Sequence, residues 1–87
     1  MGHLLVRHKV QDFSKWKAVY EAHVGARQAA GLIERQLWRN ADHPNEVLLL
    51  FEATDLGKAR AFTSSADLRQ AMQRAGVTDQ PDVYFLT

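Results

Sequence analysis

The segment with the most chemical potential is WKAVYEAHVGAR, residues 16–27, because it places two ionisable side chains on the apolar stripe of a helix. At about 100° of rotation per residue, four side chains fall within a band roughly 60° wide: Trp16, Tyr20, His23 and Arg27. The two rings offer flat apolar surface, His23 a group that titrates near neutral pH, and Arg27 a permanent positive charge. This mixture suits a planar ligand that carries oxygen atoms or negative charge.

The chemistry that these residues predict is proton transfer by His23 with support from Arg27. Histidine is suited to removing a proton from a phenol or an enolisable carbon at neutral pH, and Arg27 would hold the resulting anion. The alternative is structural. His23 would then donate a hydrogen bond to a backbone carbonyl in the core, and Arg27 would extend along its aliphatic stem to the surface. The sequence leaves both interpretations open.

Two further residues are candidates for the same ligand-binding pocket, His8 and Phe62. A buried charge without a partner is costly, so His8 is either neutral and hydrogen-bonded or part of a polar site. Its strand face looks either toward the first helix or toward a partner subunit. Phe62 lies on the second helix, where plain core packing is the alternative. The residues that share the strand face of His8 are apolar: Leu4, Val6 and Val10.

No metal site and no cofactor are expected. The four histidines, which are His3, His8, His23 and His43, lack a ligand spacing such as i and i+4 on one helix, and the chain has no cysteine. Ser64 and Ser65 lack the glycine frame of a nucleophile elbow and are interpreted as helix caps. An oxygenase built on this chain would therefore rely on its substrate to reduce oxygen.

Composition excludes several classes of function. Eighty-seven residues with 46% hydrophobic and 24% charged side chains predict one small domain, residues 1–87, that gains stability from a partner. A net charge of +1 gives no general reason to bind nucleic acid or an anionic membrane, and no apolar run approaches the ~20 residues of a membrane span. The absence of cysteine fits a cytoplasmic protein.

The elements that must position the candidate site follow from periodicity and punctuation. Strands are expected at residues 3–10, 32–39, 46–53 and 82–87. The first helix is expected to be capped by Asp12 or Ser14 and to end at Gly31. The second is expected to run from Asp55 to Gly76 with a break at Ser64 and Ser65, where Ser64 and Asp67 resemble a capping box. This order, βαββαβ, predicts an α+β ferredoxin-like fold with a four-stranded antiparallel sheet.

The segment EVLLLFEA, residues 46–53, predicts a homodimer. Val47, Leu49 and Phe51 share one face of this strand, but Leu48 and Leu50 make the other face apolar as well. Helices of one small chain cover only one face, so a second sheet from an identical subunit is the simplest cover for the other. The alternative is an exposed apolar patch. Aliphatic residues here also exclude an RNA-recognition module, which places stacking aromatics on its third strand.

Over its whole length the chain resembles the dimeric α/β-barrel proteins, and among them the small antibiotic biosynthesis monooxygenase-like domains. The segments that carry the resemblance are LLVRHKVQDFSKWKAVYEAH, NEVLLLFEATDLGKARAFTSS and ADLRQAMQRAGV. The resemblance implies a barrel formed by two four-stranded sheets, with a pocket between each sheet and its helices. Members include cofactor-independent monooxygenases of polyphenolic substrates, haem-degrading enzymes, isomerases and cyclase-like domains of unknown role.

The resemblance does not extend to the haem-degrading members. These carry an asparagine on the first strand and a tryptophan on the second helix, whereas this chain has no asparagine there and offers Phe62 in place of the indole. Three hypotheses remain: a cofactor-free monooxygenase or isomerase/cyclase, a binding domain without turnover, and a structural dimer whose polar residues satisfy one another. An open cavity that reaches His23 would favour the first two.

Overall fold

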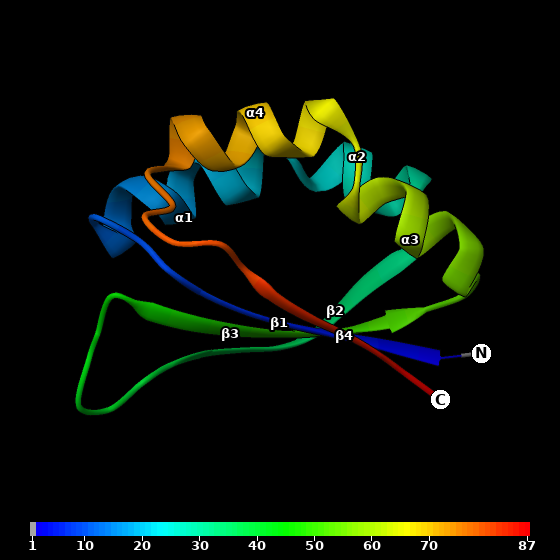
Figure 1. Ribbon diagram of the computed structural model, residues 1–87, viewed down its shortest axis with the longest axis horizontal. Coiled ribbons are helices and arrows are strands. Elements are labelled where there is room, and N and C mark those ends of the chain that lie inside the picture. The colour runs from blue at the N-terminus through cyan, green and yellow to red at the C-terminus, as the bar shows by residue number, and fades with distance from the viewer. Residues whose placement is uncertain (1) are drawn as a thin grey trace.

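The computed structural model describes residues 2–87, which form a four-stranded antiparallel sheet with helices on one face only (Figure 1). The strand order is β2-β3-β1-β4, and every neighbouring pair is antiparallel. The first and third strands are therefore central, and the predicted α+β ferredoxin-like arrangement is confirmed. The strands are β1 (Gly2–Lys9), β2 (Leu32–Arg39), β3 (Glu46–Ala53) and β4 (Asp82–Leu86).

The predicted break in the second helix is confirmed, but the first helix is also divided, which the sequence analysis did not predict. The helices are α1 (Phe13–Ala22), α2 (Val24–Ala29), α3 (Leu56–Thr63) and α4 (Ala66–Ala75). His23 separates α1 from α2, and its backbone N–H bonds the carbonyls of Val19 and Tyr20, each at 3.2 Å. In a continuous helix the Tyr20 carbonyl would accept from Val24. Here it accepts from the Arg27 side chain at 2.7 Å, so the break and the position of Arg27 are linked.

Side-chain caps define where three of the helices begin. Asp12 accepts from the Lys15 N–H at 3.2 Å, and Asp55 accepts from Gly57 and Lys58, as predicted. The cap of α4 is Ser65, which accepts from the Leu68 N–H at 3.1 Å. The predicted capping box of Ser64 with Asp67 is therefore wrong: Ser64 is the C-cap of α3, and its hydroxyl donates back to the Arg60 carbonyl at 2.9 Å. The caps of the two helices are thus the adjacent residues Ser64 and Ser65.

Two glycines end helices in the left-handed conformation. Gly31 has φ +75° and follows α2, and Gly76 has φ +79° and follows α4, as predicted. A Cβ atom at Gly31 would lie 2.3 Å from the Thr54 hydroxyl oxygen, so this turn needs glycine for space as well as for conformation.

The hydrophobic core lies between the sheet and the helices. Alternation along the central strands sends one set of side chains toward the helices, where they are almost wholly buried. His8 belongs to this buried face, so it looks toward the first helix and not away from the helices. The apolar members of this face on the two strands are Leu4, Val6, Val47, Leu49 and Phe51.

The opposite side of the sheet, the open face, is covered by no helix in the described chain (Figure 1). On the central strands it carries Leu5, Leu48 and Leu50, which are half-buried by their neighbours. Trp38 and Tyr84 flank them and are 46% and 53% exposed. Cross-strand pairs place these side chains together, since Leu50 lies opposite Leu5 and Leu48 lies opposite Trp38. The centre of the open face is therefore apolar, and Arg7, opposite Leu48, borders it with its ion pairs to Glu46 and Asp82.

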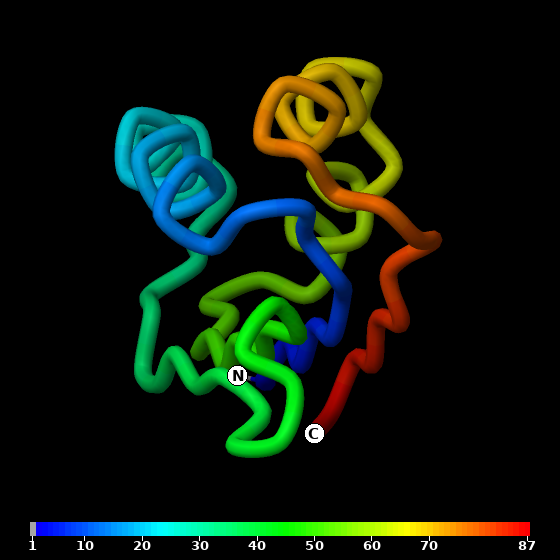
Figure 2. Tube along the Cα trace, turned by 90° about the vertical axis from the view of Figure 1, so that its left-hand side faces the viewer, coloured from blue at the N-terminus to red at the C-terminus, as the bar shows by residue number. Residues whose placement is uncertain are grey.

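Above the other face, two helical segments run side by side. Figure 2 shows α1 and α2 on one side and α4 on the other, with the sheet below both, and α1 packs against α4. Between residues 2 and 87, no helix combines the length and the apolar character needed to cross a bilayer.

Candidate functional site

A cavity of about 460 Å³ lies between the sheet and the helices. Its walls come from all four strands and all four helices, and from the residues that lead into β4. Most of the lining is aliphatic or aromatic. All six residues that the sequence analysis proposes for the site line this one cavity: His8, Trp16, Tyr20, His23, Arg27 and Phe62.

Trp16 is the centre of an aromatic stack along the cavity wall. Its ring lies parallel to that of Tyr20, with centroids 4.8 Å apart and planes 18° apart. The His8 ring meets it edge-on at 5.5 Å and 62°. Stacked and edge-to-face pairs of this kind fix ring orientation as well as burying apolar area. The stack therefore forms a rigid aromatic part of the cavity wall.

Arg27 closes the outer end of this stack. Its guanidinium carbon lies 3.7 Å from the centre of the Tyr20 ring, and its Nη1 donates to the Tyr20 carbonyl. Only 8% of the residue is exposed, so the alternative in which Arg27 extends to the surface is wrong. Burial lowers the pKa of Arg27, and the neighbouring Tyr20 and Glu34 oppose this shift. Arg27 thus stabilises the wall while it borders the cavity.

The Tyr20 hydroxyl donates to Glu34 of β2 at 2.6 Å. Burial raises the pKa of the phenol, and the hydrogen bond to Glu34 raises it further. Tyr20 is therefore held neutral and is not a candidate base. The sequence analysis overlooked Glu34, although its position two residues after the buried Leu32 places it on the helix-facing side of the strand.

His23 lies at the junction of α1 and α2 and reaches across to α4. Its Nε2 lies 3.2 Å from Asp67 Oδ2, and its ring lies 6.0 Å from that of Phe62. The alternative in which His23 bonds a backbone carbonyl through its side chain is wrong. Asp67 was expected only as part of a cap. In the structure its spacing of four residues from Ala71, which lines the cavity, places both on one face of α4.

His8 occupies the sheet side of the cavity and is 3% exposed. Burial lowers its pKa to about 4, with a smaller lowering from Arg7 and an opposing effect from Asp79. The imidazole is therefore neutral at physiological pH. Its neighbour across the cavity wall is Trp16; the structure shows no hydrogen bond from His8 to His23 or to Arg27.

The lowered pKa of His8 predicts a specific loss of stability in acid. The unfolded chain takes up this proton near pH 6.5, whereas the folded chain resists it until about pH 4, so the free energy of unfolding falls as pH drops between these values. We expect His8→Leu to remove on the order of 2–3 kcal/mol of this dependence between pH 7 and pH 4.5. Urea unfolding of both proteins at the two pH values, at one protein concentration, measures the difference.

Comparison of the two proteins is needed because other groups titrate in the same range. The pKa of Glu46 is lowered by Asn40 and Arg7, and that of Glu52 by Arg35, so both also weaken the fold when protonated. Their effect is common to the two proteins and cancels in the difference. Equal pH dependence of the natural chain and His8→Leu would show that the His8 ring is not held neutral by burial.

Several residues border the cavity that the sequence analysis did not assign to it. Arg69 is exposed, and it also lies at the cavity rim. Gln80 and Pro81 border the cavity from the segment before β4. Nothing in the local periodicity of that segment indicates this, because its position depends on the return of the chain to β1. In the chain from residue 2 onward, no group of three or more His, Asp or Glu side chains is arranged to hold a metal ion.

Comparison with known proteins yields a match at the level of structure. No family model matches the sequence, and no curated protein matches it. A protein from Bordetella bronchiseptica, provisionally assigned as an antibiotic biosynthesis monooxygenase, has 17% identity and a TM-score of 0.75, with 100% of this chain and 97% of that chain covered. A protein of the same provisional assignment from Caulobacter crescentus has 14% identity and a TM-score of 0.74, with 98% and 86% covered.

The same architecture also carries other names. An uncharacterised NIPSNAP domain protein from Burkholderia xenovorans has 10% identity and a TM-score of 0.66, with 100% of this chain and 93% of that chain covered. Identities this low establish the fold and leave the activity to be argued from the site. The resemblance in the sequence is confirmed to that extent: the chain has the fold of the antibiotic biosynthesis monooxygenase-like proteins.

Proposed function

We propose that this protein binds a small planar molecule in the cavity between its sheet and helices, and that it acts on that molecule as a cofactor-independent monooxygenase. The observation that carries the proposal is the cavity of about 460 Å³ that all six residues proposed from the sequence line. Its volume and its largely apolar wall suit a compound of two or three fused rings. The stack of Trp16 on Tyr20 supplies the surface for such a ring.

In this proposal His23 is the base. Asp67 accepts a hydrogen bond from Nε2–H, which leaves Nδ1 to take a proton from a phenol or an enolisable CH₂ group of the substrate. The anion is rich in electrons and reduces molecular oxygen directly. In an enolisable CH₂ group, the carbon keeps one oxygen atom as a carbonyl, and the second leaves as water with the two hydrogens of that group. In a phenol, the oxidised ring carbon becomes a quinone carbonyl, and the second oxygen atom leaves as water with the hydrogen of that carbon and the hydroxyl hydrogen. Arg27, at the end of the stack, holds the anion in place.

Ligand binding is tested through Trp16 fluorescence. Trp38 lies on the open face, so Trp38→Phe leaves Trp16 as the remaining indole without altering the cavity. We expect a library of hydroxylated naphthalenes and anthracenes to quench this indole in a saturable way. If no member of the library does so, the proposed site is wrong.

Turnover is tested with an oxygen electrode on the compounds that bind. We expect His23→Ala to lower oxygen uptake by about 100-fold or more, in line with the loss of a general base, while binding changes much less. Asp67→Asn is a matched variant that keeps the size of the partner and removes its charge, and we expect an intermediate loss. Binding without oxygen uptake by the natural chain would leave a binding protein and exclude the monooxygenase.

We also propose that the protein is a homodimer through its open face. The support is the apolar surface that Leu5, Leu48 and Leu50 form with Trp38 and Tyr84, opposite the helices. A surface of this kind is rare on a stable monomer, and two sheets can pack about 10 Å apart.

The absence of cysteine supports a location in the reducing cytoplasm.

A further inference from the structure

His8 is the one polar side chain that β1 directs into the cavity. It stands on the central strand among Leu4, Val6 and Val10, and 3% of it is exposed. For packing alone an aliphatic or phenyl side chain would serve this position. The presence of an imidazole there therefore calls for a reason beyond the core.

The two ring nitrogens of His8 have no hydrogen-bond partner in the protein. Among the buried side-chain nitrogen and oxygen atoms of residues 2–87, these two ring nitrogens are the ones without a hydrogen-bond partner. Leaving a buried donor or acceptor unsatisfied costs about 1–3 kcal/mol, and buried polar groups in folded proteins almost always have a partner. A neutral imidazole has one donor and one acceptor, and neither is used within the protein.

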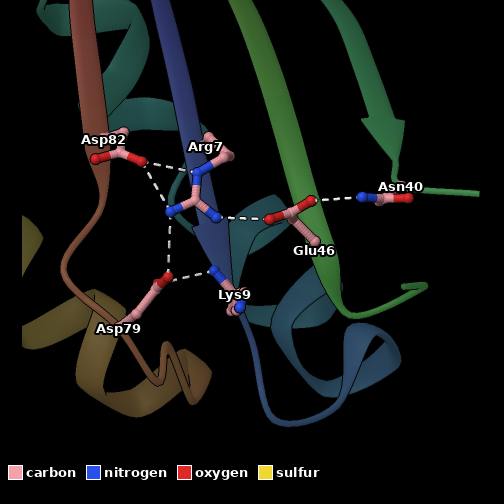
Figure 3. Close-up of polar contacts among 6 residues, drawn as sticks. All are labelled: Arg7, Lys9, Asn40, Glu46, Asp79 and Asp82. Atoms are coloured by element: carbon pink, nitrogen blue, oxygen red, sulfur yellow. Dashed lines mark hydrogen bonds and ion pairs between the residues drawn. The ribbon is translucent and has the colours of Figure 1, made fainter. Parts of the chain in front are cut away.

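The charged groups near His8 are committed elsewhere. Figure 3 shows Arg7 on the opposite side of β1, where its guanidinium bonds Glu46 at 2.6 Å, Asp82 at 2.8 Å and Asp79 at 3.4 Å. Asp79 also accepts from the Lys9 backbone N–H at 2.8 Å. These contacts fix Asp79, the acidic group whose charge acts on His8, outside hydrogen-bond reach of the ring. At the other end of the aromatic stack, Arg27 is separated from His8 by the rings of Trp16 and Tyr20.

We propose that His8 recognises the ligand, and that the ligand it selects is a neutral aromatic compound with a hydroxyl group at the end that reaches the sheet. The inference rests on the proposed function, which supplies the cavity ligand, and adds the chemical group that the ligand must carry. A hydroxyl both donates and accepts, and so matches the two functions of a neutral imidazole. A carboxylate or an ammonium group would be buried beside a ring without charge, at a large desolvation cost.

The test uses a matched pair of probes, 2-naphthol and 2-methylnaphthalene, which differ by a hydroxyl in place of a methyl group. Equilibrium dialysis at pH 7 gives the dissociation constant of each. We expect the natural chain to prefer 2-naphthol by about tenfold, which is the discrimination that one buried hydrogen bond provides. His8→Leu is expected to bind both probes equally, and His8→Gln, which keeps a donor and an acceptor, to retain part of the preference.

A second measurement separates recognition from a structural role. Because His8→Leu removes unsatisfied polar atoms from the core, we expect this variant to unfold at a higher urea concentration than the natural chain at pH 7. A His8→Leu protein that unfolds at a lower urea concentration and still prefers 2-naphthol would overturn the inference. Equal binding of both probes by the natural chain would overturn it as well, but would leave the proposal of a ligand cavity standing. If neither probe binds, and the wider library also fails, the proposed function falls and this inference falls with it.

Discussion

Replacing Leu50 with aspartate is expected to leave the protein monomeric at micromolar concentrations at which we expect the natural chain to form the proposed dimer. Leu50 lies in the middle of the open face, opposite Leu5 on one neighbouring strand and Gln36 on the other. In a dimer of two packed sheets a carboxylate at this position loses its water, and no cation on the adjacent strands is paired with it. We expect the dimer dissociation constant to rise by more than about 100-fold, or about 2.7 kcal/mol.

Light scattering and sedimentation velocity over a range of concentrations measure this change. Ala18→Asp is the matched control, because Ala18 is exposed on α1, on the far side of the sheet from the open face. We expect the control to remain dimeric. Circular dichroism shows whether each variant is folded. A natural chain that is monomeric at these concentrations, or a folded Leu50→Asp protein that is still a dimer, would contradict the proposed interface.

The chemistry of the cavity and the state of the open face are connected through β1 and β3. Successive residues on these two strands point to opposite faces of the sheet. Leu49 therefore borders the cavity, while Leu48 and Leu50 lie on the face that forms the proposed interface. An interface that stabilises this sheet therefore also holds the floor of the cavity in place. This is a reason to measure ligand binding by the Leu50→Asp monomer as well as by the dimer.

Strand order and the location of the cavity could be predicted from the sequence because both depend on local patterns. The two-residue period of β1 and the unbroken apolar run in β3 identify the central strands. Helical spacing from Trp16 to Arg27 places four side chains on one wall, and this survives the unexpected break at His23. The pattern is robust because each of these residues needs only to face the cavity.

Contacts between distant segments could not be predicted in the same way. The partners of Tyr20 and His23 are Glu34 on β2 and Asp67 on α4, and no sequence period relates one member of a pair to the other. The break in the first helix has the same origin, because the Arg27 side chain takes the Tyr20 carbonyl that the next helical turn would need. Competition between a side chain and the backbone for one carbonyl depends on how Arg27 is buried. The helix propensities of the residues carry no information about that burial.

The location of the ligand is tested most directly by filling the cavity. Ala71 of α4 is 5% exposed and lines the cavity. Its methyl group leaves space that a larger side chain would occupy. We expect Ala71→Phe to weaken binding of the naphthalene and anthracene compounds by more than tenfold, because the phenyl ring takes the volume that the ligand needs. Stability should be maintained or increased, since the new ring is buried in existing apolar space.

The direction of these two effects together distinguishes a ligand cavity from a tightly packed core. In a packed core a phenyl ring in place of a methyl group costs about 1–3 kcal/mol of stability, so a strong loss of stability for Ala71→Phe would show that the space is not available. Ala71→Leu is expected to give an intermediate loss of binding. Ala66→Phe, at an exposed position in the first turn of the same helix, is the control that should bind as the natural chain does. Unchanged binding by a stable Ala71→Phe protein would place the ligand elsewhere.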